Sequence, residues 1–104
     1  MGKSLRTVPG LDVGDRLTAT AVVSRVLAGS AFTIRDADLP PLGLLVLGLV
    51  PEGLAPHSLV TVHGTVDQFD FERFSREFGL PSPKPFEMFA DRKCLVAERT
   101  EVWA

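Results

Sequence analysis

The chain has 104 residues, 45% of them hydrophobic and 23% charged, which fits one ordinary globular domain. Its formal net charge of −2 provides no general attraction to nucleic acid or to an anionic membrane. The single cysteine excludes an internal disulfide. The longest apolar run, at 42–50, is far shorter than the roughly 20 residues that span a bilayer.

The domain is expected to cover residues 13–104, after a loose polar lead-in at 1–12 that Pro9 and Gly10 interrupt. This start lacks the apolar centre of a signal peptide. We therefore expect a cytoplasmic protein as the sequence is written, or an exported domain whose leader has been removed. The sequence leaves the oligomeric state open.

The first strand is expected at 16–27, directly after a turn signal at 13–15. Apolar and polar residues alternate along it as far as Val23, where the alternation loses its phase. One extra residue in a strand restores the phase, so we expect a β-bulge near Ser24 and Arg25.

Two short strands are expected next. The segment 31–35 directs Phe32 and Ile34 toward the core. A turn-rich loop at 36–43 leads to the segment 44–47, which is apolar in every position. This second segment therefore predicts a strand with both faces covered.

The fourth strand, expected at 59–69, shows the clearest alternation in the chain. One face carries threonine, histidine and aspartate, and the other carries Val60, Val62, Gly64 and Val66. This pattern is typical of a strand half buried in an antiparallel sheet. The glycine on the apolar face indicates a bend or the close approach of a neighbour.

A phenylalanine-rich segment follows, with six of the seven phenylalanines between residues 69 and 89. Three of these phenylalanines have helical spacing and would share one helix face: Phe71, Phe74 and Phe78. Asp70 is suited to cap a helix and Gly79 to end it, so we expect a helix near 70–78.

Beyond this helix, Pro81, Pro83 and Pro85 predict an extended path. The last strand is expected at 93–102. The chain is therefore expected to be all-β with one helix, arranged as a five-stranded antiparallel barrel.

The strand set resembles that of the OB-fold superfamily, a group of small Greek-key barrels. The segments that carry the resemblance are 17–26, 31–36, 44–48, 59–66 and 94–102. The chain is also similar to small, uncharacterised OB-like domains of high-GC bacteria, which carry a Phe-bearing helix before the last strand. One departure concerns the helix, which OB domains usually place between strands three and four. Here it is expected between strands four and five, so the usual plug of the barrel bottom need not carry over.

The resemblance implies a ligand face along strands two and three. Arg25, Thr33 and Arg35 are the residues that could line it. The phenylalanine-rich segment would flank this face. The simpler interpretation is that all its rings are core, but an exposed part would be a contact for a protein partner, with Phe86 and Phe89 as candidates.

No catalytic or metal-binding motif stands out. His57 and His63 have no cysteine or carboxylate at a metal-ligand spacing. Cys94 is interpreted as a structural thiol, because no ordered Cys–His arrangement is suggested. We expect no metal, no cofactor and no enzymatic activity.

The sequence thus favours a non-catalytic binding or assembly module, with a protein as the expected partner. The alternative is a single-stranded nucleic-acid-binding OB domain, which the expected fold favours. The net charge and the lack of an evident row of exposed aromatic residues disfavour this alternative. A pocket for a soluble ligand beneath the phenylalanine-rich segment is a third option.

Overall fold

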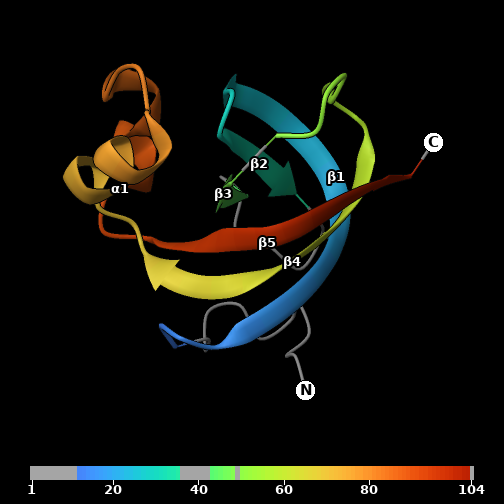
Figure 1. The fold of residues 1–104 in the computed structure, drawn as a ribbon, viewed down its shortest axis with the longest axis horizontal. Coiled ribbons are helices and arrows are strands. Elements are labelled where there is room, and N and C mark those ends of the chain that lie inside the picture. Colours follow the sequence, from blue (N-terminus) through green and yellow to red (C-terminus); the bar gives the residue numbers. More distant parts are fainter. Residues whose placement is uncertain (1–11, 36–42, 49, 104) are drawn as a thin grey trace.

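A computed structural model describes residues 12–35, 43–48 and 50–103, which form a closed five-stranded barrel with helices on one side (Figure 1). The strands are β1 (Arg16–Ala28), β2 (Ala31–Arg35), β3 (Leu44–Leu47), β4 (Leu59–Gln68) and β5 (Lys93–Trp103). Their order around the barrel is β1-β2-β3-β5-β4. This confirms the predicted OB-like barrel, with one refinement: the short β3–β5 pairing that closes it is parallel.

β1 is the long strand that pairs with β2 on one side and β4 on the other. Its register to β2 shifts between Val23 and Arg25, so the bulge predicted there is confirmed. A second shift follows between Val26 and Ala28. Such extra residues bend and twist a strand, which lets β1 curve around the barrel.

The barrel interior is filled by the alternating apolar residues of the strands. Val60, Val62 and Val66 of β4 are buried there, which confirms the predicted facing of this strand. They pack with side chains from the other four strands: Leu17, Ala19, Ala21, Val23, Phe32, Ile34, Leu44, Val46 and Leu95.

A second core lies outside the barrel, where the segment between β4 and β5 packs on it. We call this segment, residues 69–92, the insertion. Leu45 and Leu47 point outward from β3 and are buried against insertion residues together with Cys94 of β5. All four residues of β3 are buried, and the prediction that both faces of this strand are covered is confirmed.

The insertion begins with helix α1 (Phe71–Phe78). Asp70 caps it by accepting a hydrogen bond from the backbone N–H of Glu72, at 3.1 Å. Gly79 ends it in the left-handed conformation, with φ 68° and ψ 41°. The predicted helix, its cap and its terminating glycine are therefore confirmed.

Polar contacts fix α1 to the barrel at both of its ends. Ser30, in the β1–β2 connection, donates its hydroxyl hydrogen to the carbonyl oxygen of Phe78 at 2.7 Å. This satisfies one of the carbonyls that a helix C-terminus leaves without an intrahelical partner. Arg73 forms an ion pair with Asp67 of β4 at 2.9 Å and lies over the ring of Phe74.

The proline-rich part of the insertion differs from the prediction. An extended path was expected through Pro85, but residues 84–89 form the 3-10 helix η2 (Lys84–Phe89). Pro83 has helical angles, φ −71° and ψ −24°, and Pro85 lies in the first turn, where no N–H donor is required. Proline therefore starts this helix instead of preventing it.

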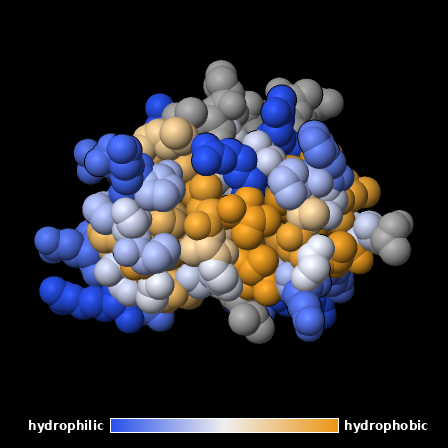
Figure 2. All heavy atoms as spheres, turned by 90° about the horizontal axis from the view of Figure 1, so that it is seen from above, coloured by the Kyte–Doolittle hydropathy of each residue, from blue (hydrophilic) through white to orange (hydrophobic). Residues whose placement is uncertain are grey.

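The lead-in expected at 1–12 and the loop expected at 36–43 lie almost wholly outside the described residues. Among the helices that the structure describes, none has the length and apolar character to span a membrane. Seen from above, apolar residues gather in the middle of the molecule beside the insertion (Figure 2).

Candidate functional site

The residues expected to line an OB-type ligand face lie on the outer side of the β1–β2 hairpin, but they differ in exposure. Arg25 and Arg35 are exposed. Thr33 is only 3% exposed, and its hydroxyl accepts a hydrogen bond from the backbone N–H of Arg25 at 3.2 Å. Two arginines are therefore on the surface, while the threonine helps to hold the bulge of β1.

The β3 part of the same face is covered. Thr33 lies opposite Leu45 and Ala31 lies opposite Leu47 across the β2–β3 ladder. Both leucines are buried against the phenylalanines of the insertion. The insertion thus occupies part of the surface on which OB domains usually bind their ligands.

The partner contact expected at Phe86 and Phe89 is not exposed. Phe86 is 1% and Phe89 is 3% exposed, and both belong to the core outside the barrel. The ring of Phe86 packs near those of Phe69 and Phe71, with centroids 6.0 Å and 5.9 Å away. The two rings are therefore buried core and not the exposed contact that was expected, although Phe86 also borders a groove of the insertion.

A groove in the insertion itself is the candidate site that we consider. It lies between the start of α1 and the 3-10 helix η2, and its volume is about 510 Å³. Its apolar wall consists of Phe69, Phe71, Pro83, Phe86 and Ala90, and its polar lining of Gln68, Asp70, Glu87 and Asp91. We call it the insertion groove. Its volume falls in the range of ligand-binding clefts, about 300–1,000 Å³.

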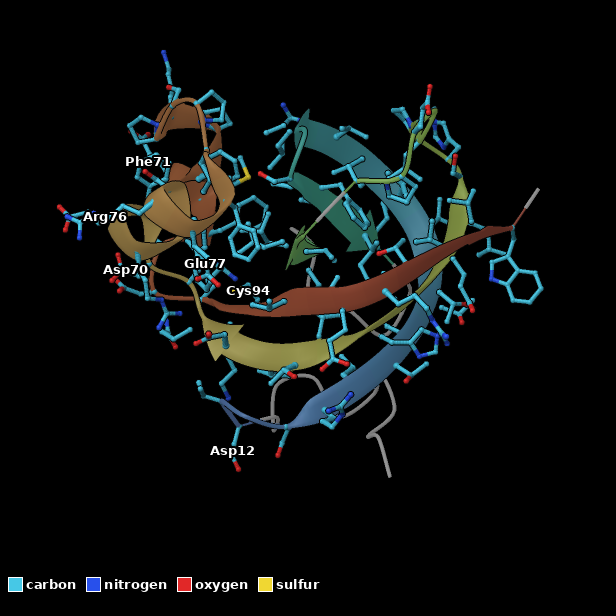
Figure 3. All side chains as sticks on the ribbon, in the orientation of Figure 1. Asp12, Asp70, Phe71, Arg76, Glu77 and Cys94 are labelled. Atoms are coloured by element: carbon cyan, nitrogen blue, oxygen red, sulfur yellow. The ribbon has the colours of Figure 1, made fainter. Side chains whose placement is uncertain are left out.

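Three carboxylates lie along the insertion groove. Asp70 is fixed by its role as the cap of α1, and Figure 3 shows it at the outer side of the insertion, away from the barrel. Glu87 is exposed on η2. Asp91 follows η2 in the left-handed region, with φ 59°, a conformation that aspartate and asparagine tolerate better than most residues.

The histidines form no metal centre. His63 lies on the outer face of β4, where its Nδ1 is 3.2 Å from the Thr18 hydroxyl and its Nε2 is 3.1 Å from the Arg99 guanidinium. The same Nε2 lies 3.6 Å from the carboxylate of Glu101, so the ring is surrounded by side chains of β1 and β5. Among the described residues, no group of His, Cys, Asp and Glu side chains is arranged to hold a metal ion.

Cys94 is buried where β5 begins, between the barrel and the insertion (Figure 3). Burial raises the pKa of its thiol to about 12, and the nearby carboxylate of Asp67 contributes in the same direction. The thiolate is the nucleophilic form of cysteine, and this environment disfavours it. The geometry agrees with a structural thiol.

Trp103, at the end of β5, is a surface feature that the strand pattern did not single out. It is 56% exposed, and its indole N–H donates to the hydroxyl of Thr61 at 2.9 Å. Thr61 also lies 2.7 Å from the hydroxyl of Thr20, so it is buried although it points outward. Thr61 and Trp103 are 42 residues apart, so no local pattern in the sequence pointed to this contact.

Comparison with known proteins adds no assignment: no protein-family model matches the chain, and no curated protein matches it in sequence.

Proposed function

We propose that the domain is a non-catalytic binding module, and that the insertion groove receives a segment of a protein partner. The observation that carries this proposal is a cavity of about 510 Å³ with phenylalanine and proline in its wall, formed entirely by residues 68–91. Grooves lined by apolar side chains with a few polar groups at their edge are typical recognition sites.

Two further observations favour a protein partner over single-stranded nucleic acid. The lining carries three carboxylates, which would repel phosphate groups. The outer face of β3, which an OB-type nucleic-acid site would use, is buried beneath the insertion.

The test fills the insertion groove with a large side chain. Ala90 is exposed and lines the groove, so Ala90→Trp should occupy the space without replacing a core residue. Random peptides displayed on phage would be selected on the wild-type domain, and their binding measured on the variant. We expect the selected peptides to lose affinity for Ala90→Trp.

Ala55→Trp is the matched control, because Ala55 is also exposed but lies in the loop before β4, outside the groove. Peptides should bind this variant as they bind the wild type. If the selected peptides bind both variants equally, or if selection yields no peptide, the proposed site is wrong. Thermal unfolding of each variant would show that the domain remains folded.

A further inference from the structure

We propose that the insertion groove selects a positively charged segment, with an arginine side chain seated between its carboxylates and its phenylalanine rings. This inference rests on the proposed function, since it specifies the chemistry of the partner that the groove would take. It is carried by the charge of the lining and by the position of the aromatic rings.

The charge of the lining has one sign. Among the described residues that line the groove, Asp70, Glu87 and Asp91 are acidic, and none is basic. Basic residues of the insertion, such as Arg73 and Lys84, lie outside this lining, so the charged groups that the described part of the chain presents to the cavity are carboxylates alone. A cationic side chain would be attracted here, and an acidic one repelled.

The aromatic wall adds a second preference for a cation. Phe71 is partly exposed and lines the groove, and its ring lies 5.9 Å from that of Phe86 at an interplanar angle of 42°. Faces of aromatic rings attract cations, and arginine combines this attraction with flat stacking and with several donors for carboxylates. The same insertion already shows such a contact, since Arg73 lies 4.4 Å above the ring of Phe74.

The experiment is a titration of the ¹⁵N-labelled domain with two short glycine–serine peptides, followed by NMR. One peptide carries two arginines, and the other has glutamine in their place. We expect the arginine peptide to shift the backbone amide signals of Phe71, Glu87 and Ala90 in a saturable way. The glutamine peptide should shift them much less, and added salt should weaken the arginine peptide's binding.

A charge-neutral variant of the groove tests the role of the carboxylates. Asp70→Asn, Glu87→Gln and Asp91→Asn are combined, because asparagine caps a helix as well as aspartate and also tolerates the left-handed region. We expect about tenfold weaker binding of the arginine peptide, from three ion pairs of moderate strength. The combination Glu52→Gln, Glu72→Gln and Glu77→Gln removes the same charge outside the groove and should leave binding unchanged.

The outcomes separate this inference from the proposed function. If both peptides shift the groove signals equally, or if the charge-neutral groove binds the arginine peptide as tightly as the wild type, cation selection is wrong while the groove remains a binding site. If the peptides selected on phage bind in the insertion groove but the arginine peptide does not, cation selection is again wrong while the groove remains a binding site. If every peptide shifts signals only outside the groove, both proposals are wrong.

Discussion

Gly64 of β4 lies directly against the backbone of Val96 in β5. A side-chain carbon built on Gly64 would collide with the carbonyl oxygen of Val96 and would lie 3.1 Å from the Cα of Ala97. The register between the two strands shifts at this point, between His63 and Gly64. The absent side chain therefore lets the backbone of β5 lie close to β4 where the ladder between them is bulged.

Gly64→Ala is expected to destabilise the domain by about 2–3 kcal/mol, in the upper range for overpacking, because the obstacle is backbone. Urea titration followed by far-UV circular dichroism measures the change. Gly29→Ala is the control: a side-chain carbon there meets nothing within 4 Å. It should change stability by less than about 1 kcal/mol. Equal losses for the two variants would show that the approach of β5 to Gly64 is not tight.

Phe86 and Met88 are near neighbours on η2 with opposite environments. Phe86 is buried, so Phe86→Ala is expected to cost about 3–5 kcal/mol through the lost burial and the cavity left behind. Met88 is largely exposed, and Met88→Ala should stay within about 0.5 kcal/mol. Both values follow from denaturant titration. A small cost for Phe86→Ala would mean that the core outside the barrel does not stabilise the domain.

The sequence predicted those features that depend on neighbours along the chain. The helix α1 followed from Asp70, Gly79 and the spacing of three phenylalanines, which are local signals. The period of two placed the valines of β4 in the core, and its loss of phase located the bulge of β1. The strand bounds could be derived for the same reason.

Features that depend on tertiary packing could not be predicted in this way. Whether Phe86 and Phe89 are core or surface depends on the outer face of β3, which lies far away in sequence. The insertion groove arises where α1 and η2 meet, and η2 was expected to be extended. The alternation put Thr61 on the polar face of β4, but it did not show that Trp103 and Thr20 cover it there.

Truncation of Thr61 and truncation of Val62 are expected to destabilise the domain for different physical reasons. Val62→Ala removes a buried aliphatic group and should cost about 1–3 kcal/mol. Thr61→Ala should cost about 1 kcal/mol through two lost hydrogen bonds, since Trp103 remains free to bond to water. Urea titration measures both costs. A cost for Thr61→Ala well above that for Val62→Ala would contradict the assigned facing of β4.

Cys94 should make the stability of the domain fall in alkaline solution. Its pKa is raised from an ordinary value of about 8.5 to about 12 in the folded state, because burial disfavours the thiolate. The folded state therefore holds this proton more tightly than the unfolded state. The resulting stabilisation is fully present below about pH 8.5 and is lost as the pH rises through about 12.

The measurement compares the wild type with Cys94→Ala by urea titration at several pH values above 8. The wild type should lose stability with rising pH more steeply than the variant, which has no thiol to ionise. The chain contains no tyrosine, so no phenol titrates in the same range. A native thiol that reacts at once with a disulfide reagent at pH 8, without denaturant, would contradict the buried environment of Cys94.

Binding to single-stranded DNA or RNA is expected to be weak and to vanish at physiological salt. Arg25 and Arg35 are the exposed cations expected on the OB-type face, while the adjoining outer surface of β3 is buried under the insertion. Binding of single strands requires a basic groove with exposed aromatic rings, and its affinity falls steeply with salt. Fluorescence anisotropy with a labelled oligonucleotide measures this, and Arg35→Ala identifies the face. A micromolar or tighter dissociation constant at physiological salt, weakened by Arg35→Ala, would instead make the β1–β2 face the binding site and overturn the preference for a protein partner.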